Sequence, residues 1–173
     1  MENTEKTMDL SRRVTIRNTT NIDTYFRYIE KPGDAFVAKK SKLPLAISEI
    51  IAQCDSGNPD FIGHGRDGKH CTFYIEDKDV RVYLGFETED GKTKQEVVDE
   101  QAIIDIFEAA NLQTFLTLLQ TKVVTDGEKQ TLRDVIASGN VNAHDKMEIA
   151  TKYLRGETIE MPKKAPGRPK KSD

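Results

Sequence analysis

Residues 87–94, with the sequence ETEDGKTK, separate two kinds of hydrophobic pattern and so decide the fold class. Before this stretch, short runs alternate between apolar and polar residues, which is the period of a strand. After it, apolar residues recur every three or four positions, as on one face of a helix. The sequence therefore predicts an α+β protein with a β-rich unit over residues 13–87 and a helical unit over residues 95–156. The polar break permits either two separate domains or one shared core.

The β-rich unit is predicted to be a small antiparallel sheet with one helix. Five runs carry strand-like alternation or β-prone residues: 14–17 (VTIR), 24–30 (TYFRYIE), 35–40 (AFVAKK), 72–76 (TFYIE) and 80–86 (VRVYLGF). A turn is expected at 31–34 (KPGD), a short strand at Phe61–Ile62, and a hairpin closed by Asp77-Lys78. The helix is expected over 43–57, with Pro44 in its first turn and Gly57 after its end.

The helical unit is predicted to hold a compact group of three to four short helices. The first is expected over 96–110, and Asn111 is positioned to cap the second. Thr125 and Glu128 form the Thr-x-x-Glu pattern of a capping box before the third helix, which Gly139 closes. Asn142 is expected to cap the last helix and Gly156 to end it.

The charge of the chain is distributed unevenly. The chain has 173 residues and a formal net charge of −3. Residues 163–173 (KKAPGRPKKSD) hold five basic residues and one acidic residue, which leaves −7 for the rest. An acidic body repels phosphate, so any contact with nucleic acid is expected in the basic tail, residues 157–173.

Compartment and membrane association are judged from the cysteines and the apolar runs. Cys54 and Cys71 are too few for a disulfide framework and lack the spacing of a zinc site. Residues 1–12 have no apolar signal segment and are expected to be a flexible arm. No run approaches the roughly 20 apolar residues of a membrane span. We expect a cytoplasmic protein, or one in a virion assembled in the cytoplasm, with no membrane partner.

A literal GxGxxG motif occurs at Gly63, Gly65 and Gly68. In a dinucleotide-binding fold these glycines follow a strand and open a helix that receives the pyrophosphate. Here a β-patterned stretch follows, and the chain has no catalytic loop or Asp-Phe-Gly motif of a protein kinase. We therefore expect a loop whose glycines adopt positive φ angles.

The same stretch contains candidate metal or catalytic residues: His64, Asp67, His70 and Cys71. Neighbouring residues at the start of a strand point to opposite faces, so His70 and Cys71 do not converge on one ion. No Gly-x-Ser-x-Gly elbow is present, and a Cys–His pair here lacks an orienting group. Acidic pairs such as Glu76-Asp77 and Glu89-Asp90 are expected in solvated turns. The prediction is a non-enzymatic protein without catalytic residues, metal or cofactor.

The basic tail contains a peptide that resembles the AT-hook, a short minor-groove DNA-binding motif. The core and its basic flanks match at Lys163, Lys164, Gly167, Arg168, Pro169, Lys170 and Lys171. The resemblance implies that Arg168 enters a narrow A/T minor groove, where the negative potential is concentrated. Pro166 stands where the hook has a second arginine, so weak, salt-dependent binding is expected. The alternatives are a solubilising tail, a contact to an acidic protein surface, or a localisation signal in a nucleated cell.

Two functions of different classes follow from these features. The first is a structural or adaptor protein that assembles with other proteins or with itself and contacts nucleic acid through its tail. Residues 61–77 and the capped helices over 96–155 resemble the head–tail connector or ring proteins of tailed phages. The second is a DNA-binding accessory or regulatory protein. Its recognition helix would be 127–139, in which Lys129 and Arg133 are offset by Glu128 and Asp134.

Overall fold

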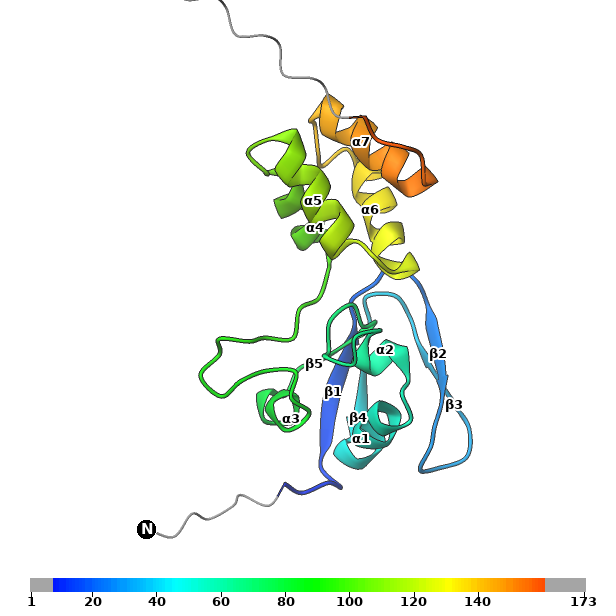
Figure 1. Cartoon of the computed structure of the whole chain (residues 1–173). Coiled ribbons are helices and arrows are strands. Elements are labelled where there is room, and N and C mark those ends of the chain that lie inside the picture. Colours follow the sequence, from blue (N-terminus) through cyan, green and yellow to red (C-terminus); the bar gives the residue numbers. More distant parts are fainter. Residues whose placement is uncertain (1–7, 161–173) are drawn as a thin grey trace, which may run out of the picture.

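The computed structural model describes residues 8–160, and the α+β class predicted from the sequence is confirmed within them. A β unit comes first in the chain and a helical unit follows it, stacked end to end (Figure 1). The two units have separate hydrophobic cores, one centred on residues such as Ile16, Phe61 and Phe73, and the other on Ile103, Phe115 and Leu132. Among the described residues, no helix is long and apolar enough to cross a membrane.

The β unit contains two small antiparallel sheets. Strand β1 (Arg13–Asn18) lies between β4 (Lys42–Ala46) and β5 (Phe73–Ile75) in a three-stranded sheet. Strands β2 (Thr24–Arg27) and β3 (Asp34–Val37) form a separate two-stranded hairpin. The buried residues of these strands alternate with exposed ones, as the sequence pattern predicts.

The helix expected over 43–57 begins later than predicted, as α1 (Ile47–Asp55). Pro44 was expected in its first turn but lies in β4, opposite Thr15. Proline is tolerated there because β4 is an edge strand. Residues from the end of the expected arm accept hydrogen bonds from the first turn of α1. The N–H groups of Ile47 and Ser48 donate to the carbonyls of Arg12 (3.0 Å) and Leu10 (2.9 Å).

The β unit has three helices rather than the one predicted. The stretch expected as a strand at 61–62 belongs instead to α2 (Pro59–Ile62), and residues 80–83 of the strand expected over 80–86 belong to α3 (Lys78–Tyr83). The hairpin expected to close at Asp77-Lys78 was therefore also wrong. In α3, Asp77 accepts a hydrogen bond from the N–H of Val80 (3.1 Å) and caps the helix. The alternation of Val80, Val82 and Leu84 was misread because residues four apart also share a helix face.

The helical unit has four helices, within the predicted range: α4 (Glu100–Phe107), α5 (Leu112–Lys122), α6 (Asp126–Ser138) and α7 (His144–Arg155). The Asn111 cap, the capping box before α6 and the closing glycines Gly139 and Gly156 are all confirmed. Two predicted starts were wrong. Residue Asp99 caps α4 after an extended segment, and Ala143 rather than Asn142 precedes α7.

The extended segment between the units ties them together. The side-chain amide of Gln95 accepts from the N–H of Ile75 (3.2 Å) and donates to the carbonyl of Phe73 (3.2 Å). It thereby satisfies the outer edge of β5 as a neighbouring strand would. One residue later, Glu96 forms an ion pair with Lys122 of α5. Gln95 and Glu96, directly after the predicted polar break, therefore connect the two units.

The first turn of α6 rests directly on the β unit. Glu128 accepts a hydrogen bond from the imidazole Nδ1 of His70 (2.8 Å). Gly127 lies against Thr20, where an added Cβ would come within 2.9 Å of the threonine methyl carbon. Further along α6, Asp134 accepts a hydrogen bond from Asn21 (2.6 Å). Close packing and polar contacts therefore hold the units in one orientation.

The packing of Gly127 on Thr20 makes a prediction about stability. Alanine in a helix is favoured over glycine by about 1 kcal/mol. Gly127→Ala in the wild-type background is nevertheless expected to lower the free energy of unfolding by about 1–2 kcal/mol, because the new methyl group overpacks against Thr20. In a Thr20→Ser background, which keeps the hydroxyl and removes the methyl group, the same change is expected to be stabilising. Urea unfolding of the four proteins measures the coupling, and equal effects in both backgrounds would contradict it.

Candidate functional site

The β2–β3 hairpin presents two exposed aromatic side chains that lie against each other. Tyr25 is 68% exposed and Phe36 is 51% exposed, and their ring centroids lie 4.8 Å apart across the two strands. Arg27 and Asp34 form the next cross-strand pair on the same face. We call these four residues the aromatic face. Exposed aromatic residues of this kind are characteristic of surfaces that bind other proteins.

The opposite face of the hairpin is anchored in the core of the β unit. Phe26 is buried and packs edge-on against Phe61 and Phe73, with ring centroids 5.1 and 5.7 Å apart. Ala35 and Val37 are buried beside it. A strand with aromatic residues on both sides can bury only one side here, so the other side stays in solvent. The aromatic face is thus presented on a fixed support.

Helix α1 fixes the end of the hairpin through two side chains. The Glu49 carboxylate accepts hydrogen bonds from the N–H groups of Ile29 (2.9 Å) and Glu30 (3.0 Å). Gln53 donates to the carbonyl of Arg27 (2.7 Å) and to Glu49 (2.8 Å). Burial alone would raise the pKa of Glu49, but these donors stabilise the carboxylate and the net effect is a lowered pKa.

The backbone of β3 has a free edge. The N–H of Tyr28 donates to the carbonyl of Gly33 (3.1 Å), so alternation makes Phe26–Ala35 a hydrogen-bonded pair and Tyr25–Phe36 a non-hydrogen-bonded pair. The backbone groups of Asp34 and Phe36 therefore point away from β2. Among residues 8–160 these groups have no hydrogen-bond partner, and β3 pairs with β2 alone. An edge of this kind is a template for strand addition.

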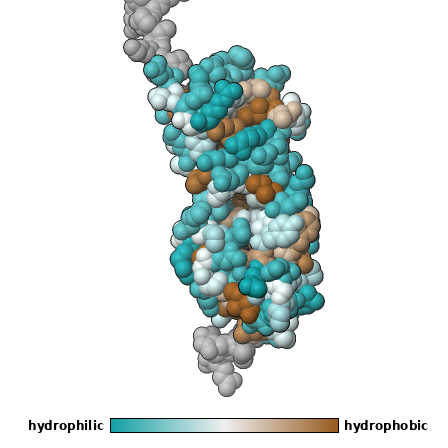
Figure 2. Space-filling model, turned by 90° about the vertical axis from the view of Figure 1, so that its right-hand side faces the viewer, coloured by the Kyte–Doolittle hydropathy of each residue, from teal (hydrophilic) through white to brown (hydrophobic). Residues whose placement is uncertain are grey.

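The hairpin lies in an electrically balanced part of the chain. Residues 13–87 contain eleven basic and eleven acidic residues, whereas residues 88–160 contain eight and fourteen. Figure 2 shows the side of the molecule on which the hairpin lies in Figure 1, with hydrophobic atoms interrupting the hydrophilic surface over both units. The β unit therefore has no formal net charge over residues 13–87.

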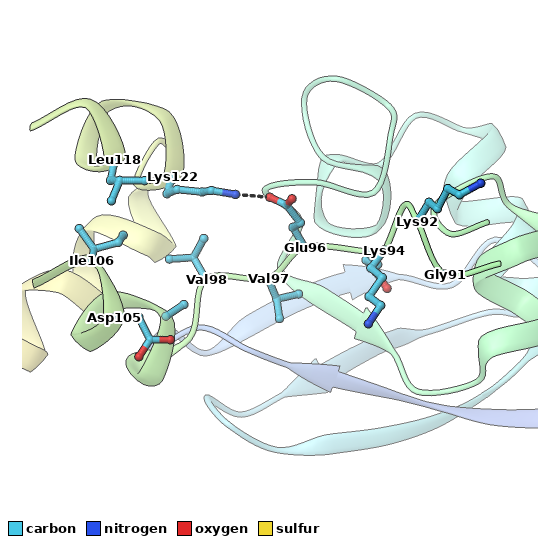
Figure 3. A pocket seen from close by; sticks show the side chains of 12 residues that line it. Gly91, Lys92, Lys94, Glu96, Val97, Val98, Asp105, Ile106, Leu118 and Lys122 are labelled. Carbon is cyan, nitrogen blue, oxygen red and sulfur yellow. Dashed lines mark hydrogen bonds and ion pairs between the residues drawn. The ribbon is translucent and has the colours of Figure 1, made fainter. Parts of the chain in front are cut away.

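A recess lies beside the segment that joins the two units. It has a volume of about 700 Å³, and Val98, Ile106 and Leu118 form its apolar walls (Figure 3). Lys122 at the rim is paired with Glu96, as Figure 3 shows, and Lys92 with Asp90 (2.8 Å). The recess therefore offers an apolar surface with a rim of largely paired charges.

The glycine motif has a structural role in positioning His70. The loop lies between α2 and β5, and Gly63 and Gly68 have positive φ angles, as predicted, whereas the prediction was wrong for Gly65. A Cβ on Gly63 would come within 1.7 Å of the carbonyl oxygen of Lys69, so only glycine fits there. The loop turns the imidazole of His70 toward α6, whereas His64 is exposed.

The two cysteines are buried thiols with unreactive surroundings. Burial raises the pKa of both Cys54 and Cys71 to about 12. The Cys71 thiol donates to the carbonyl of Gly68 (3.2 Å) and accepts from Gln95 (3.2 Å). Within residues 8–160, no group of three or more His, Cys, Asp or Glu side chains is arranged to hold a metal ion.

The other candidates from the sequence have structural contacts. Asp77 caps α3 and pairs with Arg12 (2.7 Å), which lowers the pKa of its carboxyl group. In α6, the expected recognition helix, Gly127 and Glu128 in the first turn contact the β unit. A recognition helix reads bases with its N-terminal residues, and in this arrangement that end is covered.

The residues predicted to contact DNA all lie outside the described residues: Lys163, Lys164, Gly167, Arg168, Pro169, Lys170 and Lys171. Sequence reasoning placed Tyr25 and Phe36 in strands without assigning them to a site. The available signal was the succession Tyr25-Phe26, which puts aromatic rings on both faces of one strand.

The fold and the surface together define the class of protein: an α+β chain with two small cores and a solvent-facing aromatic edge hairpin. Comparisons with protein-family models, with curated proteins and with solved structures found no match. The functional argument therefore rests on the geometry of the chain itself.

The lowered pKa of Glu49 predicts how acid affects the support of the hairpin. The stabilisation from this carboxylate is fully present above the ordinary glutamate pKa of 4.5 and is lost as pH falls through the lowered value. Glu49→Gln is expected to reduce the free energy of unfolding by about 2 kcal/mol at pH 7. The difference from wild type should shrink as the pH is lowered below 4.5.

The exposed Glu108 supplies the matched control. Glu108→Gln is expected to change the free energy of unfolding by less than about 0.5 kcal/mol at pH 7. Urea unfolding of wild type and both variants between pH 3 and 7 measures these differences in the free energy of unfolding. Circular dichroism checks that each variant is folded. A constant difference between Glu49→Gln and wild type across that range would contradict the assignment.

Proposed function

We propose that this protein is a non-enzymatic structural or adaptor protein that works by assembling with other proteins or with copies of itself. The observation that carries the proposal is the aromatic face on the β2–β3 hairpin, where Tyr25 and Phe36 are exposed on a strand pair anchored in the core. Two ordered aromatic rings lose little conformational entropy on binding, which favours their use as a docking surface.

The arrangement of charge supports a second contact through the basic tail. The tail has a charge opposite to that of the rest of the chain, so it can act as an electrostatic anchor on nucleic acid while the body binds protein. A component of the head–tail connector or ring of a tailed phage would combine these two contacts. We take that particle, assembled in the cytoplasm, as the proposed setting.

A DNA-binding accessory or regulatory protein is the competing proposal. It has the AT-hook-like tail in its favour, but the first turn of α6 lies against Thr20 and His70. Its DNA contact would then depend on the tail alone. The assembly proposal is preferred because it also uses the aromatic face.

The assembly proposal predicts that the protein associates in solution. The purified full-length chain is expected to form a dimer or higher oligomer, or to do so when a partner protein is added. Sedimentation velocity and light scattering over a hundredfold range of concentration measure this. Tyr25→Ser with Phe36→Ser is expected to weaken association at least about tenfold, because both rings leave the contact. A monomer at all concentrations that binds DNA tightly through its folded body would overturn the proposal.

The proposed contact between the tail and nucleic acid can be removed without changing the fold. Truncation after Pro162 removes all five cations of residues 163–173 and is expected to abolish most binding to an A/T-rich duplex. The circular dichroism spectrum should keep its helical and strand features. Fluorescence anisotropy across a salt titration measures the affinity, with Arg168→Lys as a control that keeps the charge. Equal binding by truncated and full-length protein would show that the tail is not the contact.

A further inference from the structure

We infer that a second copy of this chain binds, about a two-fold axis, to a face that joins the outer side of the three-stranded sheet to helix α4. The sheet side of this face is basic and the α4 side is acidic, so the basic side of each copy meets the acidic side of the other. Taking a second copy as the partner rests on the proposed function, but the contact itself does not use the aromatic face.

The outer side of the three-stranded sheet carries an excess of basic side chains. The strand register places Lys42, Arg17 and Tyr74 in one row across β4, β1 and β5. This row lies on the side opposite the buried Ile16, where α1 and α2 complete the core. Arg13 is on the same side, four residues before Arg17. Because the Lys42 side chain is 58% exposed, the row faces solvent.

One carboxylate, that of Glu76, is shared by two of these cations. The Lys42 ammonium nitrogen lies 2.7 Å from its Oε1 atom, and the Arg17 Nε lies 3.9 Å from the same oxygen. Among the described residues, that buried Nε has no hydrogen-bond partner. Arg13 donates to the uncharged backbone carbonyl of Pro44 (2.9 Å). Three cations and one carboxylate leave this side with an excess of two positive charges.

The exposed stripe of α4 is acidic. Gln101, Asp105 and Glu108 are all exposed and lie four and three residues apart, so they share one side of the helix. The Gln101 amide donates to Asp105 (2.8 Å), which holds that carboxylate on the stripe. The stripe therefore presents two negative charges.

The lysines nearest this stripe leave its charge in place. Lys122 is engaged in the ion pair with the segment between the units. Lys94 and Asp105 lie at opposite ends of the recess in Figure 3. At the end of α4, Lys146 donates to two backbone carbonyls, and the exposed Asp145 beside it in the chain offsets its charge.

A recess of about 300 Å³ at the junction of the units joins the basic and acidic sides. Arg17 and Lys40 line it from the β unit, and Asp99, Glu100 and Gln101 line it from the start of α4. Lys40 and Glu100 lie 3.6 Å apart, so charges at the centre are already paired. Arg17 belongs to the basic row and Gln101 begins the acidic stripe, so both sides lie on one face. We call the following residues the bipolar face: Arg13, Arg17, Lys42, Asp105 and Glu108.

The order of charge on the bipolar face selects a second copy as the partner. Contacts of α6 hold the units in one orientation, so the basic and acidic sides lie next to each other. A two-fold axis through the junction recess reverses this order in the second copy and places each basic side over an acidic side. Nucleic acid complements only the basic side and is repelled by the α4 stripe. A second copy complements both sides, and the contact occurs twice in each dimer.

The contact between bipolar faces is expected to depend on salt. Sedimentation velocity of the full-length chain measures the dissociation constant of the dimer. Raising the salt concentration from about 0.05 M to about 0.5 M is expected to raise this constant at least about tenfold, because the facing charges are screened. The Tyr25→Ser, Phe36→Ser variant should retain this salt-dependent association, since it removes no charge.

Charge reversal on either side tests which surfaces meet. Lys42→Glu and Glu108→Lys are each expected to raise the dissociation constant about tenfold at low salt, because each change cancels the excess charge of its side. The two changes in one chain keep the net charge of the wild type, and this double variant should also associate weakly. An equimolar mixture of the single variants should associate more strongly than either alone, because the mixed dimer keeps one wild-type contact.

Lys92→Glu is the matched control for Lys42→Glu. Each lysine is exposed and paired with one carboxylate, at 2.8 Å for Lys92 and 2.7 Å for Lys42, but Lys92 lies outside the bipolar face. Lys92→Glu is expected to change the dissociation constant less than about twofold. Equal weakening by both variants would show an effect of net charge alone and overturn the inferred contact. Circular dichroism verifies that each variant is folded.

The outcomes separate this inference from the proposed function. If the wild type associates equally at low and high salt and the charge variants match it, the bipolar face is not the contact, while assembly through the aromatic face stands. If truncation after Pro162 removes the salt-dependent association, the basic tail occupies the α4 stripe and the inferred contact is overturned. A monomer at low salt that associates only with another protein overturns the second copy and leaves the proposed function standing.

Discussion

The structure depends on one buried carboxylate, that of Glu128. Its side chain is 4% exposed and accepts hydrogen bonds from the N–H groups of Val124 (2.7 Å) and Thr125 (2.8 Å), which completes the capping box of α6. The same carboxylate accepts from the imidazole of His70, 58 positions earlier in the chain. Because a buried carboxylate is costly without partners, the helix cap and the contact between the units stabilise each other. The orientation of the helical unit on the β unit follows from this contact.

The glycine motif is explained by the same constraint. For His70 to reach Glu128, the loop before it must turn back sharply, and His70 itself adopts a positive φ of 56°. Gly63 allows the backbone of Lys69 to pass at a distance that no other residue permits. A pattern that matches a nucleotide-binding motif thus serves to place one imidazole ring. Spacing alone cannot distinguish these roles, since both require glycine for backbone conformation.

Local patterns in the sequence predicted local structure well, but they could not predict contacts between residues that are distant in the sequence. The capping box at Thr125 and Glu128 was predicted because both residues lie within one turn, whereas the second partner of Glu128 lies in another unit. The run from Val80 to Phe86 was read as a strand because a short apolar run satisfies either period. The alternation in β2 and β3 predicted two strands, but which face is buried depends on the contacts of Phe26 with Phe61 and Phe73. The sequence therefore predicted the two strands of the candidate site, but not which of their faces is exposed.

The division of charge between the units bears on the proposed assembly. The β unit is balanced, so the short-range forces of its edge, namely hydrogen bonding and burial of aromatic rings, act without net repulsion. The acidic excess of residues 88–160 repels other acidic surfaces at short range, because at the ionic strength of a cell charges are largely screened beyond about 8–10 Å. The proposed assembly through the balanced β unit therefore avoids bringing two acidic units together. In the sequence, the basic residues 163–173 follow this acidic unit and are separate from the balanced β unit. A protein that joins copies through one unit and contacts a polyanion from the other needs this separation of charge, because a uniformly basic body would bind nucleic acid at its own assembly surface.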